Sequence, residues 1–220
     1  MEVIVLKKFL VILVSIFFIF LIIICVKDEF LFNKEKNETE KTKETLIYES
    51  INSYYSKERP KNKGDLKIYN IKDLDDDFLV LCEKNSNDGQ RYSDLFILNS
   101  NYKIIGLTTG EIPISMCFSA NKVTYKDRTI LFGNFTNSKW DKVKDIKVPV
   151  NIDTIEIKLD NKILLTEKVS IDTGYIIPVE ADSIILDISL YNDGYELESN
   201  LNDIGSISEK TLKLINSTNN

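Results

Sequence analysis

The chain of 220 residues contains no histidine. This absence excludes Ser-His-Asp and Cys-His catalysis, histidine as a general base, and every zinc site that needs an imidazole ligand. A glycine-rich phosphate loop and a Gly-x-Ser-x-Gly sequence are also missing. We therefore expect a protein that is not an enzyme, with no catalytic residue, no cofactor and no metal ligand.

Positively charged residues are also fewer than negatively charged ones. The chain has 28 Lys and Arg against 34 Asp and Glu, which gives a net charge of −6 and a pI of about 4.9. Nucleic acid is an unsuitable partner, because binding to it depends on cationic neutralisation of phosphates. With 43% hydrophobic and 28% charged residues, the composition is that of an ordinary globular protein and excludes disorder of the whole chain.

One apolar run stands out, from Phe9 to Val26, with no charged residue. A helix of 18 residues rises about 27 Å, close to the roughly 30 Å of a bilayer core. Branched residues stand at the end of the run, where signal peptidase needs small ones, so we predict an uncleaved anchor over residues 1–32 with its span at about 9–26. The alternatives are a signal peptide that is cleaved off and a lipoprotein, in which Cys25 would carry the lipid.

The flanking charges set the orientation of this anchor. Lys7 and Lys8 precede the span, and a short basic N-terminus favours a cytoplasmic N-terminus with the C-terminal part outside the cell membrane. The chain is rich in Ile, Lys and Asn, and in this it resembles anchored proteins of Gram-positive bacteria. The expected partners are the membrane itself, another envelope protein or a cell-wall polymer.

Beyond the span, the pattern predicts a mainly β, α+β ectodomain. A polar spacer covers residues 33–45, and apolar positions at helical spacing indicate a juxtamembrane helix from about Lys41 to Lys57. From Leu66 the apolar period becomes two, and short turns separate the runs, which indicates antiparallel strands. A capping box at Ser206 and Glu209 predicts a short C-terminal helix over about 207–215.

The polar segment 137–150, which contains the only tryptophan, Trp140, interrupts the strand pattern. We therefore predict two strand-rich parts: a helix with an antiparallel β domain over residues 46–145, and a sandwich-like part over residues 146–220. Trp140 is either packed between the two parts or exposed as a contact residue for a partner.

Two acidic motifs imitate known sites. Asp172-Thr173-Gly174 matches the motif of aspartic proteases, but those enzymes need two such aspartates, so a turn is the better interpretation. Asp73-x-Asp75-x-Asp77 imitates the start of a calcium loop. An EF-hand needs Gly and Glu at the sixth and twelfth positions, where this chain has Phe and Lys, so we expect a solvated loop.

Cys82 and Cys117 both lie in predicted strands, where they form either a disulfide or two buried free thiols. Without histidine, neither has the usual partner of a thiol nucleophile. The hypothesis that follows is a membrane-anchored, extracytoplasmic module that acts by binding or envelope assembly. The alternatives are a carboxylate-dependent envelope hydrolase and a small subunit of a membrane complex.

The anchor yields the first prediction. The full-length protein should stay in the membrane fraction after washes with high salt and carbonate, because an apolar span is held by the bilayer core rather than by charge. Cys25→Ser should leave this unchanged, as immunoblots of the fractions would show. Transfer of the variant to the soluble fraction would mean that a lipid on Cys25 is the anchor.

Overall fold

The computed structural model describes residues 41–62, 64–85, 91–113, 117–141, 143–160, 163–200 and 206–215. The chain divides into two units, Met1–Thr42 and Lys43–Asn220, and the fold below is that of the second. The predicted span at 9–26 lies outside the described residues. Within the described part, no helix is both long and apolar enough to cross a membrane.

The first element of this unit is helix α2, Lys43–Glu58. Its buried residues Ile47, Ile51 and Tyr55 follow each other at intervals of four and therefore lie on one face. The helix ends just before Arg59 and Pro60, because the residue before a proline disfavours helical dihedral angles. The helix predicted from about Lys41 to Lys57 is confirmed to within two residues at each end, whereas its position next to a membrane stays a prediction.

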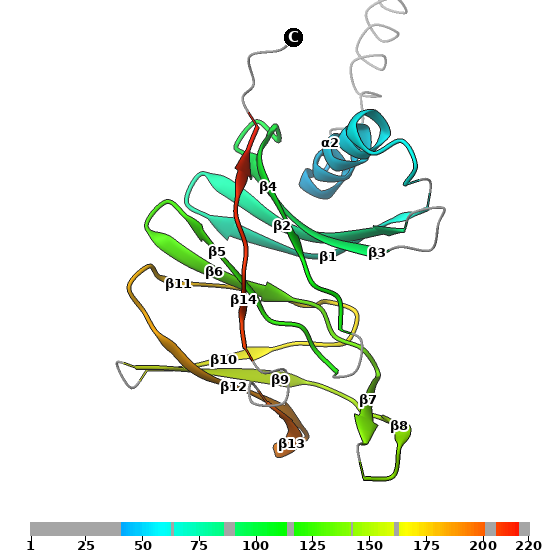
Figure 1. The fold of residues 1–220 in the computed structure, drawn as a ribbon. Helices are drawn as coiled ribbons and strands as arrows, with labels where there is room; N and C mark the ends of the chain where they lie inside the picture. Colours follow the sequence, from blue (N-terminus) through cyan, green and yellow to red (C-terminus); the bar gives the residue numbers. More distant parts are fainter. Residues whose placement is uncertain are drawn as a thin grey trace, which may run out of the picture. The chain divides into compact units, whose positions relative to one another are not determined.

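Fifteen strands form three sheets and one separate hairpin from the described residues, and most of them are labelled in Figure 1. The first sheet has the order β1-β2-β3-β4-β15 and consists of Leu66–Leu74, Asp77–Asn85, Arg91–Asn99, Ile104–Gly110 and Lys213–Leu214. The second sheet has the order β11-β6-β5-β14 and consists of Tyr175–Glu180, Arg128–Gly133, Asn121–Tyr125 and Ser208–Glu209. The third sheet has the order β10-β9-β12-β13 and consists of Leu164–Lys168, Thr154–Leu159, Ile185–Asn192 and Tyr195–Asn200. Strands β7, Ser138–Asp141, and β8, Ile146–Pro149, form the hairpin.

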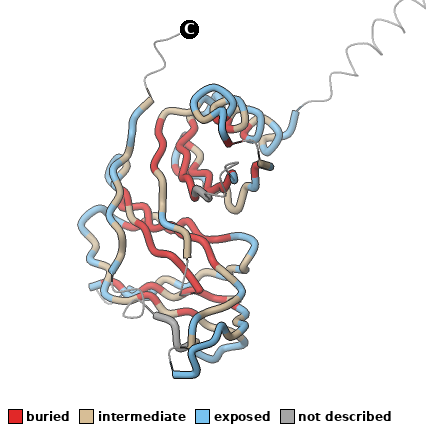
Figure 2. Tube along the Cα trace, turned by 45° about the vertical axis from the view of Figure 1, so that its right-hand side comes forward, coloured by how far each residue is buried: buried red, intermediate tan, exposed pale blue. Residues whose placement is uncertain are grey.

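Three apolar clusters join these elements into four layers. On one face of the first sheet, Val80 and Phe96 pack against Ile51 of α2. On the other face, Leu81 packs against the second sheet, in the cluster that also holds Phe132. The far face of the second sheet packs against the third sheet. The cluster between these two sheets holds Leu131, Tyr175, Ile177, Val179, Ile155, Ile157, Ile188 and Leu190. Figure 2 shows this burial in the inner strands, with exposed residues on the outer turns.

The predicted C-terminal helix is wrong. Residues 206–215, called the C-terminal strap below, are extended: β14 pairs in parallel with β5, and β15 pairs antiparallel with β4. The amides of Ser208 and Lys210 donate to the carbonyls of Ala120 and Lys122 over 2.9 and 2.8 Å. A helix of nine residues has little stability of its own, so the open edges of two sheets outweigh the capping signal.

The predicted boundary between residues 145 and 146 does not follow the sheets. Strand β11, from the later part, pairs along its whole length with β6 from the earlier part. The third sheet and the second form the expected sandwich, but its two walls come from both parts of the chain. The segment 137–150 is thus an excursion that contains the β7–β8 hairpin.

The strap yields a prediction about pH. Ser208 Oγ and Lys210 Nζ donate to Glu111 Oε1 over 2.7 and 3.0 Å, and these hydrogen bonds lower the pKa of Glu111 from 4.5. A carboxyl with a depressed pKa in the folded state stabilises the fold above its ordinary pKa, and this contribution disappears as the pH falls through the lowered value. Glu111→Gln should therefore lower the free energy of unfolding at neutral pH by less than about 1 kcal/mol, and by nothing in strong acid.

Urea unfolding of the wild type and the variant at several pH values would measure this difference. Asp65→Asn, at an exposed position, is the matched control and should show no change at any pH. A Glu111→Gln difference that persists unchanged in acid would contradict the ion-pair explanation.

Candidate functional site

A polar cluster between α2 and the first sheet surrounds the buried carboxylate of Asp94. Cross-strand pairing places Cys82, Asp94 and Thr109 in one row across β2, β3 and β4, beneath the end of the helix. The Asp94 side chain has no exposed surface. Tyr55 Oη and Arg59 Nη1 donate to its Oδ2 over 2.5 and 2.7 Å, and Thr109 Oγ1 donates to its Oδ1 over 2.5 Å.

The electrostatics of this cluster do not suit catalysis. Burial raises the pKa of the Cys82 thiol well above its ordinary value, and the nearby Asp94 carboxylate raises it further, so the sulfur stays protonated. Burial likewise raises the pKa of the Tyr55 hydroxyl, which lies 3.8 Å from Cys82 Sγ. Both carboxylate oxygens of Asp94 are occupied. The cluster therefore anchors the end of α2 to three strands.

A second site is a cavity of about 540 Å³ between the second sheet, the turn before β12 and the C-terminal strap. We call it the strap cavity. Its polar lining residues are Lys122, Thr124, Thr129, Ser183, Ser206 and Glu209. Its apolar lining residues are Val123, Ala181, Ile184, Ile185 and Ile207.

The strap cavity lies beside the apolar core of the sandwich that the second and third sheets form. Lys122 is paired with Leu131, and Thr124 with Thr129, so these side chains share the face of the second sheet that packs against the third sheet. Around Leu131 this face is apolar and fully buried. Towards β5 and β14 the same face becomes polar, and the Lys122 Nζ to Glu209 Oε2 distance is 3.3 Å. The cavity lies where the apolar filling of the sandwich stops.

The two cysteines are not brought together. Both are free and buried, but Cys82 belongs to the cluster under α2, while Cys117 belongs to the cluster between the second and third sheets. The structure thus shows the second of the two predicted alternatives, buried free thiols. Trp140 stands on β7, paired with Lys147 of β8, and 37% of its surface is exposed.

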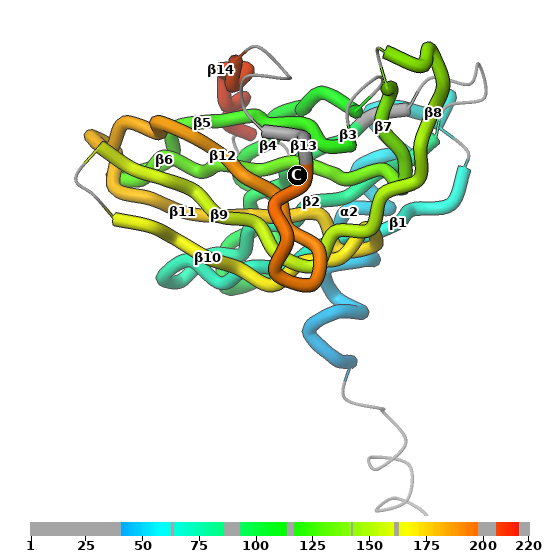
Figure 3. Tube along the Cα trace, turned by 90° about the horizontal axis from the view of Figure 1, so that it is seen from below, coloured from blue at the N-terminus to red at the C-terminus, as the bar shows by residue number. Residues whose placement is uncertain are grey.

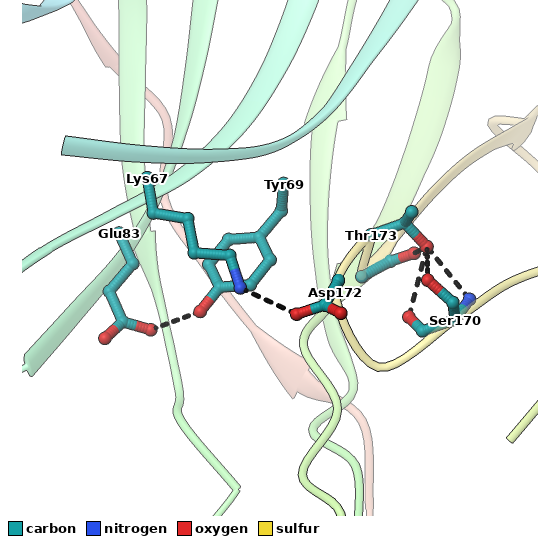
Figure 4. A network of polar contacts seen from close by, with 7 residues as sticks. Lys67, Tyr69, Glu83, Ser170, Asp172 and Thr173 are labelled. Atoms are coloured by element: carbon teal, nitrogen blue, oxygen red, sulfur yellow. Dashed lines mark hydrogen bonds and ion pairs between the residues drawn. The ribbon is translucent and has the colours of Figure 1, made fainter. Parts of the chain in front are cut away.

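Asp172 lies in the turn at residues 171–173, directly before Gly174, whose φ of +53° favours glycine. Figure 4 shows Lys67 Nζ reaching Asp172 Oδ1 over 3.1 Å, and the Ser170 amide donating to Thr173 Oγ1 over 3.0 Å. The carboxylate is exposed and forms an ion pair with lysine. Its surroundings are those of a turn residue and do not resemble a shared-proton dyad.

The carboxylates of the acidic motif at 73–77 have separate partners and do not converge on one point. Asp75, with φ of +52°, stands in the turn between β1 and β2. Asp77 points inward and accepts from Tyr125 Oη over 2.6 Å and Lys126 Nζ over 2.7 Å, while Asp73 pairs with Lys43. Among the residues that the structure describes, no group of three Cys, Asp or Glu side chains could hold a metal ion.

Sequence reasoning missed both Asp94 and the strap cavity. Asp94 stands directly before the apolar run Leu95–Leu98, and a charged residue that begins a fully buried strand segment is a usable signal. The polar residues at 122, 124 and 129 give no such signal, because alternation in a half-exposed strand has the same pattern.

Comparison of the chain with family models, with curated proteins and with solved structures finds no match in any of the three.

The Asp94 cluster yields a stability prediction. Asp94→Ala should lower the free energy of unfolding by about 3 kcal/mol, because it leaves the Tyr55 hydroxyl and the Arg59 guanidinium beside an empty space with one charge uncompensated. Asp76→Asn, at the exposed β1–β2 turn, is the control and should change it by less than about 0.5 kcal/mol. Chemical denaturation measures both values. A loss below about 1 kcal/mol for Asp94→Ala would contradict the anchoring role.

Proposed function

We propose that residues 43–220 form an extracytoplasmic binding module that the apolar segment 9–26 tethers to the cell membrane. The support for the tether is the uncharged apolar run, the two lysines before it and the polar spacer that leads into α2. The helix that follows the spacer in the sequence, α2, packs its buried face on the first sheet. The N-terminus is cytoplasmic in this proposal, and the module lies outside.

The strap cavity is the observation that carries the binding role. Its volume of about 540 Å³ falls within the range of ligand sites, which is roughly 300–1,000 Å³. Its polar lining is accessible: Thr129 is buried, Lys122 and Ser183 are half-buried, and Thr124, Ser206 and Glu209 are exposed, so these groups can meet a ligand at the open edge of the sandwich. Four hydroxyl groups, one ammonium group and one carboxylate line this space.

The chemistry of this lining suits a polar fragment of a cell-wall polymer. The hydroxyls of Thr124, Thr129, Ser183 and Ser206 both donate and accept hydrogen bonds, as a sugar or peptide fragment requires. The aliphatic residues Ile184, Ile185 and Ile207 offer contact to its apolar parts. A cell-wall polymer is also the partner that a module on the outer face of the membrane would meet first.

The carboxylates favour binding over hydrolysis. Glycoside hydrolysis generally needs two carboxyl groups about 5–9.5 Å apart. In the described lining of the strap cavity, Glu209 is the sole acid. Asp94, the fully buried carboxylate, is enclosed by its hydrogen-bond donors on the far side of the first sheet.

The test uses the full chain in nanodiscs and purified bacterial cell walls. The wild type should sediment with the walls, and Thr124→Val with Thr129→Val should weaken this association at least tenfold, because the isosteric methyl groups remove two hydrogen-bonding hydroxyls. Thr166→Val, at an exposed position of β10, is the matched control and should bind as the wild type does.

Two outcomes would contradict the proposal. Equal sedimentation of the wild type and the double valine variant would exclude the strap cavity as the binding site. Release of soluble wall fragments by the wild type, abolished by Glu209→Gln, would establish the hydrolase instead.

A further inference from the structure

The β7–β8 hairpin is the element that the proposed binding role leaves unexplained. It stands outside the three sheets, and Figures 1 and 3 show it extending beyond the strands of the third sheet. Its register pairs Trp140 with Lys147 and Asp141 with Ile146. The most exposed apolar residue of the described chain is at its tip: Val143 is 95% exposed, and Ile146 is 50% exposed.

The tip is held in a defined conformation. Asp141 Oδ1 accepts from the amides of Val143 and Lys144, each over 3.0 Å, and these hydrogen bonds lower the pKa of Asp141. Asp145 takes a φ of +55°, a left-handed conformation that closes the loop. Because these hydrogen bonds lie within the loop, the exposed position of Val143 does not depend on contacts with the core.

The charge of the hairpin is opposite to that of the protein. Residues 138–149 contain four lysines and two aspartates, whereas the whole chain has a net charge of −6. Lys144 and Lys147 are both exposed, and Lys147 lies directly across from the indole of Trp140. The hairpin thus combines an exposed aliphatic tip, an indole and cations on an otherwise acidic molecule.

We propose that this hairpin docks on the surface of a bilayer that contains anionic lipids. Lysine ammonium groups are attracted by lipid phosphates, indoles concentrate at the level of the headgroups, and an aliphatic tip is stabilised at the boundary with the acyl chains. An anionic wall polymer would attract the lysines but would offer no apolar region to Val143 and Ile146. A bilayer satisfies all three features at once.

This inference rests on the proposed tether, which keeps the hairpin at high local concentration near the membrane. The segment between the predicted span and the module is long enough for the hairpin to reach the bilayer. The 16 residues at 27–42 span at most about 55 Å when extended. A compact domain of about 180 residues has a radius of gyration near 16 Å, hence a diameter of roughly 40 Å. Either end of the module can therefore meet the bilayer.

The experiment exploits Trp140, the only tryptophan in the sequence, so that the fluorescence of the full chain reports on the hairpin. The full chain is reconstituted into vesicles of phosphatidylcholine alone or with phosphatidylglycerol. In the anionic vesicles, Trp140 emission should shift to the blue and brominated lipids should quench it; 1 M salt should reverse both effects by screening. In the neutral vesicles, emission should remain that of an exposed indole.

Variants separate docking from other effects. Lys144→Gln with Lys147→Gln should abolish the shift in anionic vesicles, and Val143→Ser should reduce quenching by brominated lipids. Lys103→Gln with Lys158→Gln removes two exposed lysines elsewhere and should leave the response intact. Circular dichroism and melting temperatures of all variants should match those of the wild type, because the changed side chains are exposed.

The same emission and acrylamide quenching in both vesicle types would overturn the proposal. So would a blue shift that appears only when an envelope protein is added, because the hairpin would then be a protein contact. The tether is tested independently by flotation with neutral vesicles. A chain that fails to float with them, yet shows the Trp140 response with anionic vesicles, overturns the tether and supports the hairpin.

Discussion

The first sheet is apolar on both of its faces, and the layer arrangement of the folded unit follows from this constraint. In β2, Leu79 and Leu81 point to one side, while Val80 and Cys82 point to the other, and all four are fully buried. A sheet of this kind needs a cover on each side. Helix α2 supplies one cover, and the second sheet supplies the other. The second sheet then has its own far face to bury, against the third sheet. On the outward face of β9 and β10, the polar Lys158 and Thr166 and the apolar Leu164 are exposed, and the described residues form no further layer there.

Asp94 is a charged exception inside this apolar arrangement. A buried carboxylate is tolerated only when its oxygens are hydrogen-bonded and its charge is paired. Tyr55 and Arg59, at the end of α2, meet both requirements together with Thr109 of β4. Apolar contacts alone would leave the helix free to shift along the sheet. The carboxylate fixes the C-terminal end of the helix over one row of residues.

Elements set by local pattern were predictable from the sequence, whereas features set by distant partners were not. The spacing of Ile47, Ile51 and Tyr55 predicts α2, and the period of two with short turns predicts the antiparallel strands. The C-terminal segment has a helix cap in its sequence, but its structure depends on the unpaired edges of β4 and β5, which lie about a hundred residues earlier. The same limitation applies to the strap cavity. Lys122 and Thr124 line a cavity only because the turn before β12 and the C-terminal strap come to lie beside β5.

The C-terminal strap connects the strap cavity to the rest of the fold. Its residues Ser206, Ile207 and Glu209 line the cavity, while its amides complete the edge of the second sheet, and β15 completes the edge of the first. A ligand that contacts the strap therefore stabilises the pairing of both sheets, because binding to the folded state alone shifts the folding equilibrium. Glu111 acts in the same direction, since it holds Ser208 and Lys210 from the loop that precedes β5. In the proposed binding role, a ligand in the cavity would therefore stabilise both sheet edges through the ten residues of the strap.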